Sequence, residues 1–299
     1  MLSADLLAKV RRLEITSAKL VEEIFAGQYL SVFKGRGIEF SDVRDYQWGD
    51  DIRAMHWRAL ARSGGKPYIK RFIEERQLTV VLAIDLSGSQ DFGSKERAKR
   101  ELVQDVAGLL AYMALKNKDR VGLFLFTDQT ELFLPPRSGR SHALRIMREL
   151  VAFQPSSEKT DLRLGMRFLL QMIKKRSIVF LISDFLDTGF ETELGILGKK
   201  HDVIAVSVDD PAEETLPVLP ARVILEDAEN PGLIGELDLR REDHLSYLSE
   251  STAQWKEEMR EFFRRSGIDL LELSTDKDFT DALMAFFRRR QQKKLTRAR

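Results

Sequence analysis

Short apolar strands alternate with amphipathic helices from residue 78 onward, and this alternation limits the folds that the chain can adopt. The first such segment, "LTVVLAID" (78–85), is apolar and β-branched throughout, which is typical of a strand buried on both faces. Strands that are separated by helices pair in parallel through right-handed crossovers. The sequence therefore predicts an α/β protein with a doubly wound, mainly parallel sheet. Further strands are predicted at 121–126, 130–135, 177–183, 202–208 and 268–273, and helices at 95–116, 142–153, 162–174, 190–199, 242–266 and 278–290.

Three segments fall outside this alternation. Residues 1–77 open with helical spacing (6–25) and then become polar, aromatic and rich in glycine, so we expect a separate N-terminal segment that packs on the core. The stretch 221–239 has two short strand patterns around "NPG" and predicts an inserted β-hairpin. Residues 291–299 continue a strongly basic stretch and are expected to form a tail. The α/β domain itself is then predicted to span residues 78–290.

Composition excludes several classes of function. The chain has 48 Lys and Arg against 47 Asp and Glu, so its overall charge gives no reason to expect nucleic acid as a partner. It has no cysteine, which excludes disulfides, thiolate metal sites and cysteine nucleophiles. Charged residues interrupt the start of the chain where a signal peptide would be apolar, and no apolar run approaches the ~18 residues of a membrane span. We expect a cytoplasmic protein.

Polar oxygens follow the predicted strands at the edge where doubly wound sheets bind their ligands. Asp85, Ser87 and Ser89 follow the first buried strand, Thr160 precedes a helix, and Asp184 follows the strand 177–183. Two carboxylates and three hydroxyls, without His or Cys, suit a hard cation such as Mg²⁺, Mn²⁺ or Ca²⁺. Each group also has a simpler interpretation, because a serine in a turn or a threonine before a helix commonly caps a helix. Since Asp184 is predicted at a strand end, we expect its replacement by alanine to leave no buried cavity.

The order of these residues resembles the metal-ion-dependent adhesion site of von Willebrand factor A domains. That site has the pattern Asp-x-Ser-x-Ser, then a Thr, then an Asp after a later strand, and it matches Asp85, Ser87, Ser89, Thr160 and Asp184. The resemblance implies a Rossmann-like sheet of von Willebrand factor A type and a bound Mg²⁺ or Mn²⁺. It also implies that the ion keeps a coordination position open for a carboxylate from a protein partner.

Nearly the whole chain also resembles the bacterial family called domain of unknown function 58. The resemblance lies in "YLSVFKGRGIEFSDVRDYQWGDDIRAMHWRALARSG", "PYIKRFIEERQLTVVLAIDLSGS", "DRVGLFLF", "SGRSHALRIM", "TDLRLGMRFL", "LISDFLD" and "HDVIAVSVDDPAEETLP". The family usually has Pro where Trp48 stands and Ile-Asp where Met55 and His56 stand, whereas the metal set is complete. Members are often encoded beside MoxR-type AAA+ ATPases, which implies such an ATPase as the partner of an adaptor.

The N-terminal polar segment has two interpretations. Its arginines alternate with acidic residues, which argues against a nucleic-acid patch and favours a salt-bridged cap that packs on the sheet through Tyr46, Trp48 and Trp57. The alternative is a surface for docking a partner beside the metal site. His56 is expected to pack or to cap a helix. The candidate docking residues are Arg36, Arg44, Asp50, Asp51, Arg53 and Trp57.

The expected function is a non-enzymatic, metal-dependent protein-interaction module, and two alternatives stay open. A Mg²⁺-dependent phosphohydrolase would use Asp85 as its nucleophile, but that chemistry needs a second Asp two positions later, where the chain has Ser87. The basic stretch at 288–299 offers a site for nucleic acid or an anionic membrane, although a solvated helix end explains it more simply.

Overall fold

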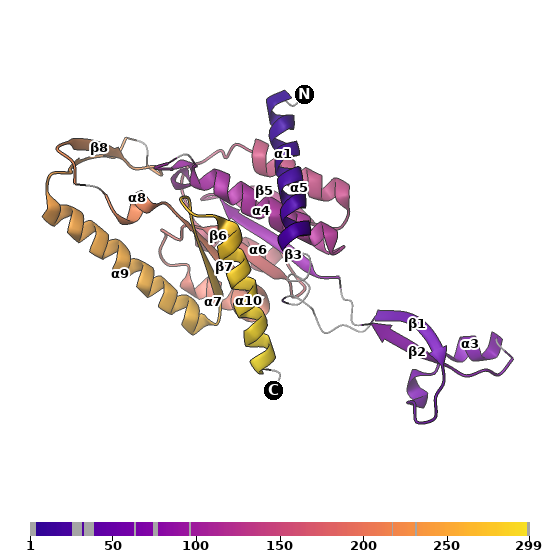
Figure 1. Cartoon of the computed structure of the whole chain (residues 1–299). Helices are drawn as coiled ribbons and strands as arrows, with labels where there is room; N and C mark the ends of the chain where they lie inside the picture. Colours follow the sequence, from indigo (N-terminus) through magenta and orange to yellow (C-terminus); the bar gives the residue numbers. More distant parts are fainter. Residues whose placement is uncertain are drawn as a thin grey trace. The chain divides into compact units, whose positions relative to one another are not determined.

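A computed structural model describes residues 4–25, 32, 39–62, 64–73, 77–95, 97–216, 218–230 and 232–297. It divides into two compact units, of which the larger comprises Met1–Val32 with Thr79–Arg299 and the smaller comprises Phe33–Leu78. The predicted doubly wound sheet is confirmed in the larger unit (Figure 1). Its six strands are β3 (Thr79–Asp85), β4 (Arg120–Phe126), β5 (Thr130–Arg137), β6 (Ile178–Ser183), β7 (Asp202–Asp209) and β10 (Asp269–Ser274).

The strand order is β10-β7-β6-β3-β4-β5, and every neighbouring pair is parallel except β4 and β5. The chain leaves β3 toward β4 and β5 and later returns to the other side of β3 with β6. The order of the strands therefore reverses between β3 and β6, and the crevice at such a switch point is where doubly wound sheets bind ligands.

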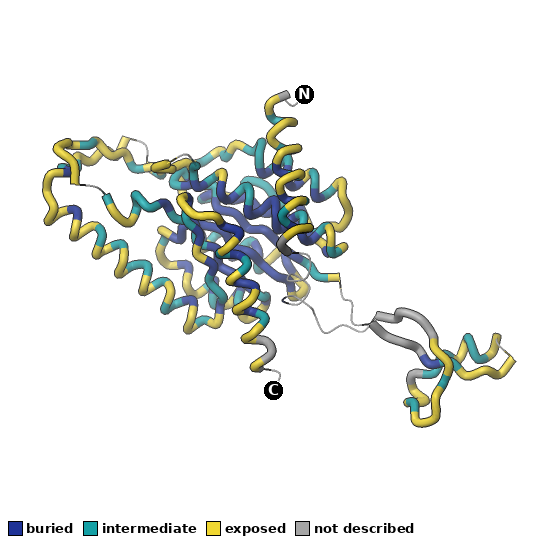
Figure 2. Tube along the Cα trace, in the orientation of Figure 1, coloured by how far each residue is buried: buried dark blue, intermediate teal, exposed yellow. Residues whose placement is uncertain are grey.

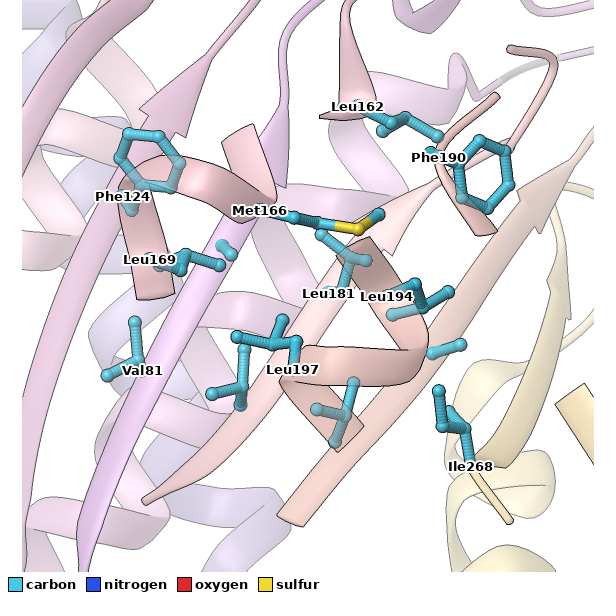
Figure 3. Close-up of a cluster of buried hydrophobic side chains, with 14 of the residues drawn as sticks. Val81, Phe124, Leu162, Met166, Leu169, Leu181, Phe190, Leu194, Leu197 and Ile268 are labelled. Atoms are coloured by element: carbon cyan, nitrogen blue, oxygen red, sulfur yellow. The ribbon is translucent and has the colours of Figure 1, made fainter. Parts of the chain in front are cut away.

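Helices cover the sheet because alternate residues of its strands point to opposite faces, and both faces are apolar. On one face α6 and α7 pack on Val81, Ala83, Phe124 and Leu181 (Figure 3), while α4 and α5 pack together with α1 elsewhere on the unit. The buried strands form the dark centre of Figure 2. The helices of this unit are α1 (Ala4–Leu20), α4 (Lys99–Lys116), α5 (Arg140–Ala152), α6 (Leu162–Met172), α7 (Glu191–Lys200), α8 (Pro211–Glu214), α9 (Glu242–Ser266) and α10 (Phe279–Arg297), with short π- and 3₁₀-helical turns at Val21–Phe25 and Gly88–Asp91.

The predicted hairpin is confirmed and lies outside the main sheet. Strands β8 (Arg222–Glu226) and β9 (Ile234–Asp238) pair antiparallel in a two-stranded sheet of their own. The helix predicted at 278–290 is longer than expected, because α10 continues to Arg297 through most of the stretch assigned to a basic tail, in agreement with its simpler interpretation as a helix end. Its charges are partly used within the fold: Arg290 pairs with Asp202, and Lys293 donates to Asp269 over 2.8 Å.

The smaller unit is built around an antiparallel pair, β1 (Glu39–Asp45) and β2 (Tyr68–Ile73), with a 3₁₀ turn at Ile52–Ala54 and the short helix α3 (Trp57–Arg62). The expected N-terminal segment of residues 1–77 is therefore divided in the structure. Helix α1 packs against α4 and α5 and belongs to the larger unit, because its apolar face, with Leu13, is buried there. The packing of the smaller unit on the sheet stays a prediction.

Two helical glycines predict opposite effects of the same substitution. A Cβ at Gly165 in α6 would lie 2.9 Å from the ring of buried Phe126, whereas a Cβ at Gly195 in α7 would meet no atom within 4 Å. We expect Gly165→Ala to lower the free energy of unfolding by about 1–2 kcal/mol, because overpacking a core outweighs the helix propensity gained. Gly195→Ala should raise it by up to about 1 kcal/mol. Urea denaturation measures both, and equal stabilisation would show that α6 does not pack this closely on β4.

Candidate metal centre

The candidate site begins where β3 and β6 end side by side. Ile84 of β3 pairs with Ile182 of β6, so that Asp85 is level with Ser183. The Ser183 hydroxyl donates a hydrogen bond to Asp85 Oδ2 over 2.8 Å, and both side chains are fully buried. Asp184 follows directly and is only 2% exposed. The fold therefore brings Asp85 and Asp184 to the switch point of the sheet, as the sequence predicted.

The loop after β3 presents the two serine hydroxyls to each other. Asp85 Oδ1 accepts a hydrogen bond from the backbone N–H of Ser87 over 2.9 Å, which folds the loop back over the carboxylate. The hydroxyls of Ser87 and Ser89 then lie 3.1 Å apart. Ser87 stands at the N-cap of the 3₁₀ turn Gly88–Asp91, but its side chain makes no capping bond. Helix capping therefore does not explain why Ser87 carries a hydroxyl.

Thr160 lies in the loop before α6, and its simpler interpretation as a helix cap is wrong. Asp161 caps α6 instead, since its carboxylate accepts from the N–H of Leu164 over 2.8 Å. The Thr160 hydroxyl donates to Glu229 Oε1 over 2.6 Å. Glu229 follows β8 in the hairpin, so a residue far along the chain completes this side of the site.

Asp184 is held by a buried cation. The ammonium of Lys99, which is fully buried at the start of α4, lies 2.9 Å from Asp184 and 2.6 Å from Glu213. Burial alone would lower the pKa of Lys99, but the charges of both carboxylates outweigh it and raise this pKa. The expectation that Asp184→Ala leaves no buried cavity is wrong, because the Asp184 side chain is itself buried. The change would also deprive the buried ammonium of Lys99 of one of its two partners.

Asp210 positions Glu213, the second carboxylate that pairs with Lys99. It caps α8 in a capping box, in which its backbone N–H donates to Glu213 Oε2 over 3.0 Å. Burial would raise the pKa of Asp210, but hydrogen bonds led by those from Ser94 and Thr275 lower it to about 2. Asp210 therefore stays ionised at neutral pH and fixes the carboxylate of Glu213 against Lys99.

Asp85 has no such cation. Its hydrogen-bond partners are the backbone of Ser87 and the hydroxyl of Ser183, both neutral, and no described cationic side chain forms a salt bridge with it. Burial, together with the nearby charge of Asp184, raises the pKa of Asp85 to about 7. The Asp184 charge also adds to burial in raising the pKa of Glu229. The charge of Asp184 thus acts on both Asp85 and Glu229, whereas the ammonium of Lys99 contacts Asp184 and Glu213.

The donor set fits a small divalent cation. An octahedral Mg²⁺ binds oxygen at about 2.0–2.1 Å, which places neighbouring ligands about 3 Å apart. The hydroxyls of Ser87 and Ser89 have this separation. The described residues contain no cluster of three His, Cys, Asp or Glu side chains that could hold a metal, so hydroxyls would have to supply part of the coordination. Asp85, Ser87, Ser89, Thr160 and Asp184 would hold the ion, and that assignment stays a prediction.

The predicted docking residues lie in the smaller unit, except Arg36, which lies outside the described residues. Arg44 binds Asp50 with two hydrogen bonds of 2.6 and 2.8 Å, and this pairing lowers the pKa of Asp50. Asp51 accepts from the backbone N–H of Arg53 and caps the turn that follows.

One histidine and two tryptophans of the smaller unit have different surroundings. His56 accepts the N–H of Ala59 at Nδ1 over 2.9 Å and so caps α3, as one of its interpretations predicted. Trp57 is 58% exposed and Trp48 is 99% exposed, so the smaller unit itself covers neither ring.

Sequence reasoning missed Lys99, Glu213 and Glu229. Lys99 precedes the apolar positions Leu102 and Val106 at helical spacing, which places it on the buried face of α4. Glu213 stands in "DPAE", a capping-box sequence whose fourth residue turns back toward the first. Nothing in the local sequence marks Glu229, because its contact with Thr160 joins residues 69 positions apart.

Comparison with known proteins identifies the family. A sequence profile described as "Protein of unknown function DUF58" matches residues 42–254. The chain belongs to this family. An uncharacterised Mycobacterium bovis protein, Mb1516, is 29% identical over 287 residues, which cover 94% of this chain and 88% of the relative. The Mycobacterium tuberculosis protein Rv1480 matches equally, and it is also uncharacterised.

Solved structures with similar folds include BatB from Bacteroides thetaiotaomicron and the von Willebrand factor A domain of SpRpn10. BatB is 15% identical with a TM-score of 0.47, and the match covers 72% of this chain and 99% of BatB. The SpRpn10 domain is 11% identical with a TM-score of 0.38, and the match covers 70% of this chain and 94% of that domain. The family resemblance predicted from the motifs is confirmed by the profile match. Among the described residues, no helix has the length and apolarity needed to cross a membrane.

The raised pKa of Asp85 predicts how stability depends on pH without metal. Asp85 has a pKa of about 7 when folded and about 3.9 when unfolded, so the folded state binds the proton more tightly. The free energy of unfolding should therefore fall as pH rises from about 4 to about 7. Denaturation in EDTA at pH 5 and pH 8 should show this fall in wild type and a smaller one in Asp85→Asn. An identical pH dependence in the variant would contradict the assignment.

The buried ion pairs of Lys99 predict a large effect of a single substitution. Lys99→Met should lower the free energy of unfolding by about 3–5 kcal/mol, because it leaves the buried charge of Asp184 and the half-buried charge of Glu213 without their cation. The double variant Lys99→Met, Asp184→Asn should recover part of this loss. Lys95→Met is the control, since Lys95 is exposed and its pair with Asp276 should be worth at most about 1 kcal/mol. Equal effects at both lysines would refute the buried network.

Proposed function

We propose that this protein is a non-enzymatic interaction module that binds Mg²⁺, or Mn²⁺ or Ca²⁺ in its place, and uses the ion to hold a carboxylate of a protein partner. The observation that carries the proposal is the pair of serine hydroxyls, 3.1 Å apart, beside a fully buried Asp85 with which no described cationic side chain pairs. A divalent ion at this point would offset the charge of Asp85 and convert the serine hydroxyls into ligands.

An ion held by two carboxylates and three neutral hydroxyls stays electrophilic. One of the two carboxylates, Asp184, already shares its charge with Lys99, which leaves the ion still less neutralised. Such an ion favours a further anionic oxygen, and a carboxylate is the anionic oxygen that side chains and chain ends of proteins carry. The chemistry of the site therefore supports capture of an acidic group from a partner.

The surface around the site suits a protein partner. Phe92 and Leu186 are 43% and 57% exposed, close in sequence to Ser89 and Asp184. The hairpin that carries Glu229 also exposes apolar side chains on both strands and beyond its turn. These are Ile224, Leu225, Leu233 and Ile234. Exposed apolar groups beside polar ones are typical of surfaces that bind other proteins.

The two alternatives have weaker support. In a phosphohydrolase, the side chain two positions after Asp85 would be an acid, whereas here it is the hydroxyl of Ser87, bonded to that of Ser89. In α10, Arg290 and Lys293 already pair with acidic side chains of the fold, which reduces the basic surface available to nucleic acid or a membrane.

The partner that the family resemblance implies is a MoxR-type AAA+ ATPase, for which this protein would act as an adaptor. We propose that the smaller unit provides a second contact through Arg44, Asp50, Asp51, Arg53 and Trp57. Its support is the exposed indole of Trp57, since tryptophan and arginine are enriched where proteins bind each other. The Arg44–Asp50 pair would shape this surface.

Metal binding predicts a thermal shift that depends on the serine hydroxyls. Mg²⁺ at about 100 times its dissociation constant should add about 2.7 kcal/mol to the free energy of unfolding. Ser87→Ala with Ser89→Ala should abolish this response and leave the metal-free protein folded, because the hydroxyls support no helix cap. Thermal denaturation with and without Mg²⁺ measures the response. An equal shift in the double variant would exclude these serines as ligands.

The same double variant tests the function in an affinity purification. Partners retained by wild type in Mg²⁺ should be released by EDTA and should be absent from the double variant. Asp184→Ala is the poorer choice here, because it disturbs the pairing of Lys99. A partner that binds wild type and the double variant equally, with or without EDTA, would show that the metal does not mediate that contact.

A further inference from the structure

The turn of the β8–β9 hairpin places one carboxylate at the candidate metal centre. Asp227 Oδ1 accepts hydrogen bonds from the backbone N–H groups of Glu229 and Asn230, over 2.8 and 2.9 Å. This bonding fixes the turn and directs the chain at Glu229. The side chain of Glu229 then accepts the hydroxyl proton of Thr160 over 2.6 Å.

The backbone of the same turn fits closely against the serine loop. A Cβ added to Gly88, between the two serines, would lie 2.0 Å from the carbonyl oxygen of Ala228. Only glycine permits this approach. Gly88 also donates its N–H to the carbonyl of Glu158 over 2.8 Å, which ties the serine loop to the loop that carries Thr160. The hairpin thus seats on both loops of the site.

The charges around Glu229 favour a cation between them. Glu229 is half-buried, and no salt bridge with its carboxylate is found among the described residues. The only ammonium that contacts Asp184 within the described part of the chain is that of Lys99, which is shared with Glu213. The hydroxyl of Thr160 donates to Glu229 Oε1 over 2.6 Å, so an ion held by Thr160 would lie next to this carboxylate.

We infer that Glu229 is an internal ligand of the metal, in the position that the proposed function gives to the carboxylate of a partner. The inference rests on that proposed function. The isolated protein would hold its own site closed, and a partner would have to displace the hairpin before its carboxylate reached the ion. Gly88 is needed because the hairpin cannot seat without it.

A purely structural role for this contact predicts something different. The Thr160–Glu229 bond would then only fasten the hairpin, and the coordination of the ion would not depend on Glu229. The two roles are distinguished by the number of water molecules on the bound ion, because each position that Glu229 vacates is open to water.

Manganese alone serves as the probe, with the relaxation of water protons as the readout. Bound Mn²⁺ relaxes solvent protons in proportion to the water molecules that it coordinates. Glu229→Ala should raise the relaxation per bound Mn²⁺ by one additional water and weaken Mn²⁺ binding at least about tenfold. Gly88→Ala should also add a water, because it displaces Ala228 without removing any oxygen from the site.

The control is Glu236→Ala, which removes a carboxylate from the same hairpin where it pairs with exposed Arg222. This variant should match wild type in both measurements. Equal relaxation per bound Mn²⁺ in wild type and Glu229→Ala would overturn the internal ligand. If that result comes with Mn²⁺ binding that Ser87→Ala, Ser89→Ala abolishes, the proposed metal centre stands and only the internal ligand fails. If wild type binds no Mn²⁺, both proposals fail together.

Discussion

The burial of Asp85 beside Asp184 is the constraint on which the rest of this site depends. The two carboxylates follow neighbouring parallel strands that end at the same level, because Ile84 pairs with Ile182 across the switch point of the sheet. Burying a charge is costly unless it is paired. Asp184 has Lys99, whereas the described residues offer Asp85 only neutral hydrogen-bond donors, and its pKa is raised to about 7. A positive charge near Asp85 would therefore stabilise the fold, and Asp85 lies at the switch point, where such sheets bind ligands.

The inner part of the site stands on rigid elements. Lys99 comes from the first turn of α4, whose position is set by a long buried face, and Glu213 is fixed by the capping box of Asp210. The outer oxygens of Thr160 and Glu229 come from a loop and a hairpin turn. An inner set on helices and an outer set on a loop and a turn is the arrangement expected of a site that exchanges one ligand for another.

The sequence predicted the sheet well because its strands are buried on both faces and so are apolar throughout. The oxygen set could be predicted for the same reason, since polar residues directly after such strands lie at one edge. Groups that depend on contacts between distant residues could not be found in this way. Lys99 pairs with a residue 85 positions away, and Glu229 reaches Thr160 across 69 positions.

Two boundaries were misjudged because composition does not determine packing. The helix predicted to end at 290 continues as α10 to Arg297, and Arg290 and Lys293 pair with acidic side chains on β7 and β10. Helix α1 was grouped with the polar segment that follows it, although its apolar face packs against α4 and α5. In both cases a partner far along the chain decides the outcome.

The central claim is that a divalent cation completes the charge of this site, and anomalous scattering from crystals grown with Mn²⁺ tests it most directly. The account predicts one manganese peak in the larger unit, within about 2.5 Å of the hydroxyls of both Ser87 and Ser89. A well-ordered site at saturating Mn²⁺ with no peak beside these hydroxyls would contradict it.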